Sequence, residues 1–139
     1  MDEPLNSPEV LNVAETIASL RFVGDRKPMS TKADLEGAFA KLSTYRDGGI
    51  FVGHYAGNSE WERHPIGDEI VFVLEGQTTL ILLIDEVEQP NLLTAGKMLI
   101  VPANTWHRFE TPDGVKIMSV TPQPGDHCVD HPLSSAADF

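Results

Sequence analysis

The sequence predicts an all-β fold, a sandwich or a barrel, with a short N-terminal helix. From Ile50 onward, runs of β-branched and large aliphatic residues alternate evenly with turn residues, which is typical of such folds. The ten prolines and eleven glycines suit the many turns of a short-stranded fold. The 139 residues fit one domain with its own hydrophobic core. We expect a single domain over 1–139, with a barrel core over about 45–122, an N-terminal extension over 1–44 and a C-terminal tail over 123–139.

The N-terminal extension is expected to contain one helix followed by a loop. Ser7 and Pro8 suit the start of a helix over 7–20. Apolar residues then follow at a helical spacing, at Val10, Val13, Ile17 and Leu20. The stretch GDRKPMST, residues 24–31, is expected to form a loop.

Residues 33–45 fit either a helix or the first arm of a β-hairpin. The clear strand 50–55 on the far side of RDGG favours the hairpin, with 39–45 as its first arm. Further strands are expected at 61–64, 69–74, 78–84, 98–101, 106–110 and 115–121. The tail after Pro122 is expected to be irregular.

Charge and cysteine usage exclude some classes of partner and favour one compartment. The net charge of −11, from 21 acidic and 10 basic residues, disfavours binding to nucleic acid or to an anionic membrane surface. Cys128 is the single cysteine, so no intrachain disulfide can form and a reducing compartment is favoured. The acidic, polar beginning MDEPLNSPEV does not resemble a signal peptide. We therefore expect a cytoplasmic protein.

The stretch WERHPIGDE contains the first half of a candidate metal site. Glu62 and His64 are two residues apart and therefore face the same side of a strand. Glu69 begins the next strand and can face the same interior, and His107 lies on a later strand just past a turn led by proline. Imidazoles and carboxylates around one point form a ligand set for a divalent transition metal.

These residues resemble the two motifs of the cupin superfamily. The first motif, G-x5-H-x-H-x3,4-E-x6-G, is matched by Glu62-Arg63-His64 in the H-x-H place, then by Glu69 and Gly76. The second, G-x5-P-x-G-x2-H-x3-N, is matched by Gly96, Pro102 and His107, with Asn104 in place of the glycine and Thr111 in place of the final asparagine. Asparagine suits that position because it tolerates a left-handed backbone conformation. The stretches WERHPIGDE and VPANTWHRF also resemble a group of small single-domain bacterial cupins without an assigned reaction.

The resemblance implies a cupin-type β-barrel, also described as a double-stranded β-helix or jelly roll, with Glu62, His64, Glu69 and His107 as metal ligands. Glu62 departs from the family histidine, which leaves three interpretations open. It is a ligand, and two carboxylates then favour a harder metal such as Mn²⁺ or Fe²⁺. It stands off a metal held by two histidines and one carboxylate, as a proton acceptor. In the third interpretation the metal is lost, and Glu62 is an ordinary polar residue at the barrel mouth. The ion itself is left open among Fe, Mn, Zn and Ni.

Other polar and aromatic residues are weaker candidates. His54 can line the cavity and act as a base, although an exposed or hydrogen-bonded role is the more common one for such a residue. Phe109 is in phase with His107 and suits the cavity wall or the core, whereas Trp106 is expected to pack outside the barrel or at a subunit contact. The tail residues His127, Cys128, Asp130 and His131 match no ligand spacing, so a flexible polar tail is the favoured interpretation.

Two functions from different classes follow. The first is a metal-dependent enzyme of oxygenase or isomerase type acting on a small organic molecule, with Glu62 or His54 as the candidate base. The alternative is a non-catalytic cupin that binds a metal or small molecule for sensing or storage; a metal-free structural barrel is the third possibility. The family resemblance and the edge strands of such a fold also predict a homodimer.

Overall fold

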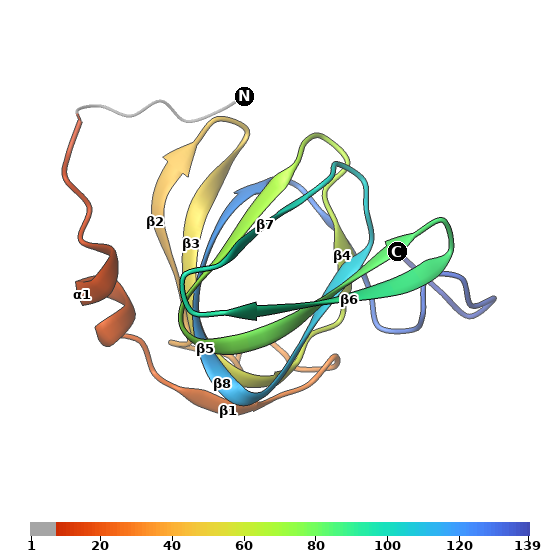
Figure 1. Ribbon diagram of the computed structural model, residues 1–139, viewed down its shortest axis with the longest axis horizontal. Coiled ribbons are helices and arrows are strands. Elements are labelled where there is room, and N and C mark those ends of the chain that lie inside the picture. The colour runs from red at the N-terminus through yellow and green to blue at the C-terminus, as the bar shows by residue number, and fades with distance from the viewer. Residues whose placement is uncertain (1–7) are drawn as a thin grey trace.

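The structure, a computed structural model, describes residues 8–139 as one helix and nine strands wrapped into a barrel (Figure 1). The elements are α1 (Val13–Ala18), β1 (Val23–Arg26), β2 (Phe39–Tyr45), β3 (Gly48–Asn58), β4 (Trp61–Arg63), β5 (Glu69–Ile84), β6 (Val87–Thr94), β7 (Met98–Val101), β8 (His107–Pro122) and β9 (Asp126–Cys128). Within the described residues, the helix is far too short to cross a lipid bilayer.

The long strands β5 and β8 form the frame of the barrel. They pair antiparallel, and their register shifts twice, between Val73 and Glu75 and between Gly76 and Thr79. Such bulges bend a strand and increase its twist, so the pair curves around the interior. The predicted strands 69–74 and 78–84 are therefore halves of one bent strand. Gly76 has a φ of 76° and approaches β8 so closely that a Cβ would lie 2.4 Å from a backbone oxygen.

The remaining strands extend this frame on both sides. The predicted hairpin is confirmed: β2 and β3 pair antiparallel, and β3 continues the sheet beside β8. On the other side, β5 pairs with β7 and β6. The strand β6 was not predicted, because its sequence VEQPNLLT contains a proline and several polar residues. Within residues 8–139 it pairs only with β5, and an edge strand tolerates a proline and exposed polar side chains.

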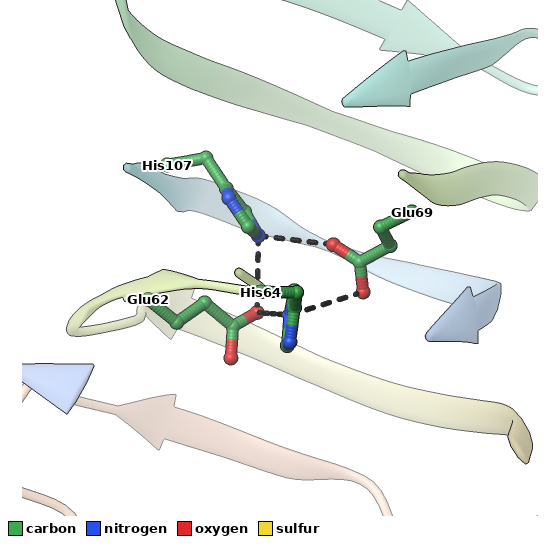
Figure 2. Close-up of side chains that lie close together, drawn as sticks. All are labelled: Glu62, His64, Glu69 and His107. Atoms are coloured by element: carbon green, nitrogen blue, oxygen red, sulfur yellow. Dashed lines mark ion pairs between the residues drawn. The ribbon is translucent and has the colours of Figure 1, made fainter. Parts of the chain in front are cut away.

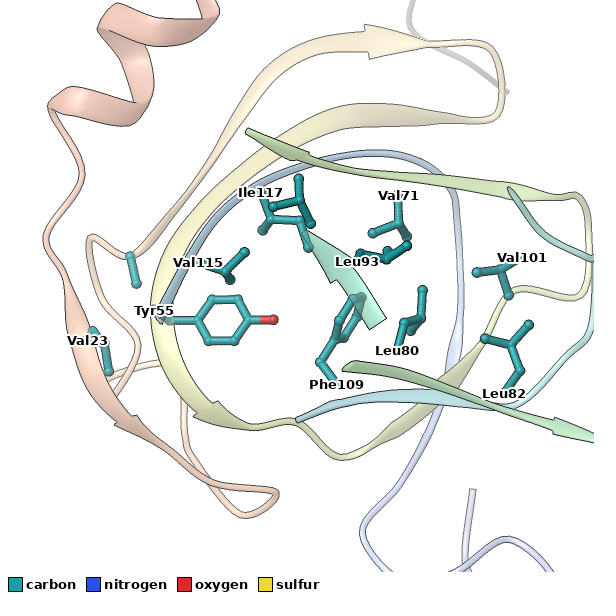
Figure 3. Close-up of a cluster of buried hydrophobic side chains, with 12 residues drawn as sticks. Val23, Tyr55, Val71, Leu80, Leu82, Leu93, Val101, Phe109, Val115 and Ile117 are labelled. Atoms are coloured by element: carbon teal, nitrogen blue, oxygen red, sulfur yellow. The ribbon is translucent and has the colours of Figure 1, made fainter. Parts of the chain in front are cut away.

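Alternate residues of these strands fill the barrel with a hydrophobic core (Figure 3). On β5, Val71, Val73, Leu80 and Leu82 are buried. They pack with side chains from the other strands, including Tyr55, Leu93, Val101, Phe109, Val115 and Ile117. Glu69 shares the inward face of β5 with Val71 and Val73, since residues two apart point to the same side. A charged residue is thereby placed inside the barrel.

The N-terminal helix is shorter than the sequence predicts. It begins after Asn12, whose side-chain oxygen accepts a hydrogen bond from the Glu15 N–H at 3.0 Å. The predicted start at Ser7 lies outside the described residues, and Val10 precedes the helix and is fully exposed. The helix anchors itself through Ile17, which is buried. The cap at Asn12 therefore determines the start.

The loop predicted over 24–31 is wrong for its first residues. Val23–Arg26 forms β1, which lies parallel to β3 with Arg26 opposite Gly57. Gly57 permits this approach: its φ is 112°, and a Cβ there would lie 2.1 Å from the Arg26 carbonyl oxygen. The pairing depends on a residue that is distant in the sequence, which local turn propensities do not reveal.

The tail is irregular as predicted except for one short strand, but it packs against the barrel. Asp126–Cys128 forms β9, which pairs antiparallel with β4, with His127 opposite Glu62. Trp61, Ile81, Trp106 and Cys128 form a second hydrophobic cluster beneath the tail. Trp106 packs against Phe139 with ring centroids 4.9 Å apart. Trp106 therefore lies outside the barrel interior, as expected, but the tail of its own chain covers it.

The barrel carries an outer apolar face that the described chain does not cover. Because Val71 and Val73 point into the barrel, Ile70 and Phe72 point outward. Ile70 and Phe72 pair with outward residues of β7 and β8. We define this outer apolar face as Ile50, Ile70, Phe72, Met98, Ile100, Met118 and Val120. Met98 and Ile100 are more than half exposed. Large exposed apolar patches on soluble proteins commonly mark interfaces, so this face is the expected contact of the homodimer, which stays a prediction.

We predict that Ile100→Lys converts a dimer into a monomer. The substitution places a charge on the outer apolar face without changing a buried side chain, so folding should be unaffected. Light scattering after size-exclusion chromatography reports the mass. Val87→Lys is the control, since Val87 is equally exposed and lies outside this face. A monomeric wild-type protein, or a dimeric Ile100→Lys variant, contradicts the prediction.

Candidate metal centre

Four residues from three strand ends meet inside the barrel (Figure 2). Glu62 is the central residue of β4, and His64 follows directly after that strand. Glu69 is the first residue of β5, and His107 is the first residue of β8. Glu62 and His107 are register partners across the sheet. The sequence-predicted set is therefore brought together as one possible metal-binding cluster.

The ligand atoms of this cluster lie at short distances. Nε2 of His107 is 2.9 Å from Oε1 of Glu69 and 3.3 Å from Oε1 of Glu62. Nε2 of His64 is 3.7 Å from Oε2 of Glu69 and 4.0 Å from Oε1 of Glu62. Two ligands that are each about 2.1 Å from one ion are separated by roughly 3.0 Å at a right angle and 4.2 Å when opposite. These separations fit a shared ion.

Neighbouring groups orient two of the four side chains. The Nδ1 atom of His107 lies 2.9 Å from the carbonyl oxygen of Thr105, which accepts a hydrogen bond from it. In the neutral imidazole this leaves the lone pair on Nε2, directed at the cluster. The hydroxyl of Thr121 donates a 2.6 Å hydrogen bond to Oε2 of Glu69, and Ser119 lies 2.8 Å from Thr121. Such partners are typical of metal ligands, because they hold the ligand atoms in place.

Polar atoms of the cluster are buried without hydrogen bonds within residues 8–139. They are both ring nitrogens of His64, Oε1 of Glu69 and Nε2 of His107. The 2.9 Å contact between His107 and Glu69 is short but lacks hydrogen-bond geometry. Buried polar atoms of folded proteins are nearly always satisfied, so the unpaired Nε2 atoms of the two histidines and Oε1 of Glu69, which face one another, favour a ligand between them. The residues present therefore fit a divalent metal.

The charges of the cluster shift two pKa values strongly. Burial lowers the pKa of His107, but the contacts and charges of Glu62 and Glu69 outweigh burial and raise it to about 10. Burial raises the pKa of Glu62, while the contact with His107 and the charges of the surrounding imidazoles lower it to about 2. Without a metal at neutral pH, Glu62 is an anion and His107 a cation. A metal ion would replace the His107 proton.

The second motif contacts the first through Asn104. Its φ is 61°, the left-handed conformation expected from its place as a substitute for glycine. Its backbone N–H donates a 2.9 Å hydrogen bond to the carbonyl oxygen of His64. The turn before β8 is therefore hydrogen-bonded to the segment that carries His64, and it leads directly to His107 at the start of β8.

A cavity of about 290 Å³ opens beside the cluster, with Glu62, His64 and Glu69 in its wall. Glu62 is the most accessible of the four, with 25% of its side chain exposed, whereas His107 is fully buried. Phe109 lines the cavity and also belongs to the core, so both roles suggested by its phase apply. This size suits a small organic molecule.

The structure does not bring His54 to the cluster. Its β3 neighbour Tyr55 points into the barrel, and His54 consequently points outward. It contacts Phe22 at 4.8 Å between ring centroids and lines a separate depression with Glu75 and Lys116. Burial and the Lys116 charge lower the pKa of His54.

The two ends of the chain contribute cavity residues that the sequence did not indicate. Arg26 of β1 and Phe39 of β2 line the cavity, as do Gly125 and His127 of the tail. His127 was considered only as part of a tail cluster without ligand spacing. A Cβ on Gly125 would lie 2.8 Å from Nδ1 of His64, so the tail packs directly on a cluster residue. No local motif carries this information, because β1 and β9 reach the site only through long-range pairing.

Comparison with known proteins places the chain in a family. The Cupin domain family matches residues 52–121, about half of the chain, so the chain belongs to the cupin domain family. It is 34% identical over 68 residues to "Uncharacterized protein YdbB" of Bacillus subtilis (strain 168), a match that covers 48% of this chain and 57% of that relative. The chain thus spans little more than half the length of this relative.

Solved structures show the same barrel. A cupin-2 domain containing protein from Shewanella frigidimarina NCIMB 400 is 25% identical, with a TM-score of 0.53 over 61% of this chain and 79% of that one. A hydroquinone 1,2-dioxygenase, PnpCD, solved with Cd²⁺ and 4-hydroxybenzonitrile, is 17% identical, with a TM-score of 0.58 over 88% of this chain and 80% of that one. The predicted cupin β-barrel with a short helix is therefore confirmed.

We predict that metal binding strengthens as pH rises. With a pKa of about 10, His107 carries a proton at pH 7 that the metal must displace, whereas Glu62, at about 2, is already ionised. The apparent affinity for Mn²⁺ should therefore rise roughly tenfold per pH unit from pH 7 to 9, with a proton released on binding. Calorimetry in buffers of different ionisation enthalpy measures both. An affinity that does not change over this range contradicts the role of His107 as a ligand.

Proposed function

We propose that the protein is a metal-dependent enzyme of the oxygenase or isomerase type, acting on a small organic molecule in the barrel cavity. The observation that carries the proposal is the convergence of two imidazoles and two carboxylates, with buried atoms lacking hydrogen-bond partners, in the wall of that cavity. A structural role alone does not account for buried ionisable groups next to an open cavity, since such groups are costly to bury.

The four side chains have different environments within the proposed centre. His64, Glu69 and His107 are buried and would hold the ion firmly. Glu62 is partly exposed to the cavity, so it is the ligand next to a bound substrate. Two carboxylates offset the charge of a divalent ion and favour the harder ions Mn²⁺ and Fe²⁺. The bound ion would supply Lewis acidity and a point of attachment for substrate oxygen.

The electrostatics of Glu62 favour the ligand role over the role of a proton acceptor. A carboxylate with a pKa of about 2 is a weak base, because proton acceptors work best with a pKa near the operating pH. His127 is the imidazole in the cavity wall outside the four-residue cluster, and its Nδ1 lies 3.0 Å from Oε1 of Glu60. It is half exposed, so it is placed to exchange protons between the cavity and solvent.

The structural comparison supports the choice of substrates to test. The hydroquinone dioxygenase with the same fold was solved with both a divalent metal and a phenolic molecule. Phenols with Fe²⁺ and oxygen are the first panel for this chain, and keto acids are the second.

We predict that the protein copurifies with about one divalent metal ion per chain, and that His64→Ala and His107→Ala each lower metal affinity by at least about a hundredfold. Elemental analysis of untagged protein and metal titration measure this. Oxygen uptake with phenols and keto acids under Fe²⁺ tests the oxygenase type. Deuterium uptake from D₂O into substrate, without oxygen, tests the isomerase type.

His54→Ala is the matched control, because it removes an imidazole from the same barrel outside the cluster. It should leave metal content and turnover unchanged. Metal content that is insensitive to both His64→Ala and His107→Ala rules out the proposed centre. Metal binding without turnover on the panels would favour a non-catalytic cupin that binds a metal or small molecule.

We predict that Glu62→His keeps the metal but shifts its preference toward Ni²⁺ and Zn²⁺. The substitution exchanges a hard oxygen ligand for an imidazole and removes one negative charge. Competition between Mn²⁺ and Ni²⁺, measured for the variant and the wild-type protein, gives the change in preference. An identical preference in both proteins would show that Glu62 does not bind the ion.

A further inference from the structure

The guanidinium of Arg26 faces the cavity from the end of β1. It lies over two aromatic rings, 4.6 Å from the ring centroid of Tyr55 and 5.1 Å from that of Phe39. Arg26 and Phe39 line the cavity that contains the four-residue cluster. The close approach of β1 to Gly57 of β3 fixes this placement, because Arg26 is the register partner of that glycine. Long-range pairing therefore delivers one cation to the cavity.

This cation has no carboxylate partner among residues 8–139. Two other arginines of the barrel do form ion pairs. Arg63 lies 2.7 Å from Asp126, and Arg108 lies 3.0 Å from Glu110. Arg26 is partly buried on aromatic rings that cannot neutralise its charge. A guanidinium without a carboxylate partner among these residues, in a partly dry site, is well suited to bind a carboxylate through two parallel hydrogen bonds.

The charge balance of the cavity also favours a negatively charged ligand. A divalent ion neutralises Glu62 and Glu69, and the two neutral imidazoles add no charge. His127, at the cavity wall, is paired with Glu60. Among the cavity residues within 8–139, the positive charge of Arg26 is then left unbalanced. A substrate with one negative charge would complete the balance.

The walls and the size of the cavity indicate what the rest of the bound molecule is like. Phe39, Phe51 and Phe109 contribute aromatic surfaces, and Ile117 adds an aliphatic one. The volume of about 290 Å³ gives space for roughly ten water-sized groups, close to the size of a benzoate ion. Aromatic side chains in a pocket favour flat aromatic ligands through stacked and edge-to-face contacts.

We propose that the substrate is a small aromatic monocarboxylate, whose carboxylate binds Arg26 while its ring lies among the phenylalanines beside the metal centre. This inference rests on the proposed function, since it assigns the substrate class of the same cavity. Arg26 is a substrate-binding residue and does not contact the four-residue cluster in the structure.

The test compares acids with matched amides. Calorimetry with Mn²⁺-loaded protein measures the binding of benzoate and of 2-, 3- and 4-hydroxybenzoate, each beside its neutral amide. At least one acid should bind the wild-type protein at least tenfold more tightly than its amide. Arg26→Gln should abolish this preference and change Mn²⁺ affinity by less than about threefold. Arg26→Lys should retain part of the preference, because it keeps the charge but loses the planar fork.

Arg46→Gln is the matched control. Arg46 also lies over a tyrosine ring, at 5.5 Å from Tyr45, but it is outside the cavity. It should preserve the preference for the acid. Equal binding of acids and amides by the wild-type protein, a failure of every acid to bind, or a preference that survives Arg26→Gln overturns the proposal.

The metal and the carboxylate are tested separately. Wild-type protein that binds none of Mn²⁺, Fe²⁺, Zn²⁺ and Ni²⁺ refutes the proposed metal centre, and the acid-to-amide ratio of the metal-free protein still decides the role of Arg26. Should Arg26→Gln melt at a clearly lower temperature than the wild-type protein, Arg26→Lys decides: a reduced preference for the acid supports the two-hydrogen-bond site, and an undiminished preference overturns it.

Discussion

The contacts of His107 with the carboxylates of Glu62 and Glu69 determine how the rest of the site is arranged. Charged groups are expensive to bury and persist only with opposite charge at close range. The imidazole supplies that charge when it is protonated, and its raised pKa reflects the two carboxylates beside it. A divalent ion would also place positive charge beside the same two carboxylates. The arrangement therefore requires a cation at this point, and either the protonated His107 imidazole or a divalent ion can provide it.

The barrel separates this polar cluster from a hydrophobic core that uses the same strands. On β5, Glu69 and Val71 are on one inward face, so a residue of the candidate metal centre and a core residue are held by the same backbone. On β8, His107 and Phe109 have the same relationship, and their rings are 6.3 Å apart in an edge-on arrangement. Because cores are closely packed, the core limits how far the ligands can move. Such rigidity suits a centre whose ligands must keep their separations.

The ends of the chain complete what the barrel strands begin. The strand β1 carries Arg26 to the cavity, and the tail carries Gly125 and His127 to it. The tail is held by the contact of Trp106 with Phe139 and by the ion pair of Arg63 with Asp126, so its position is set by packing and charge together. Central strands supply the four residues of the candidate metal centre, and the terminal segments supply the groups that would recognise a substrate.

Short-range patterns were sufficient for the ligand positions and for most strands. The two-residue period placed Glu62 with His64, and the turn residues marked the strands from Ile50 onward. The same patterns failed where pairing is long-range. The strand β1 forms because Gly57 admits a second backbone, and β9 forms because β4 offers it a free edge. An edge strand such as β6 needs no strand-like sequence, since one neighbour and solvent satisfy it.

The sequence by itself determined the fold class, the family and the identity of four candidate ligands, because motif spacing and alternation are local properties of the chain. Only the tertiary structure decided that His54 faces outward, that the tail covers Trp106, and that Arg26 reaches the cavity. These placements depend on which strands pair across large sequence separations, and that choice is made by the packing of the whole barrel.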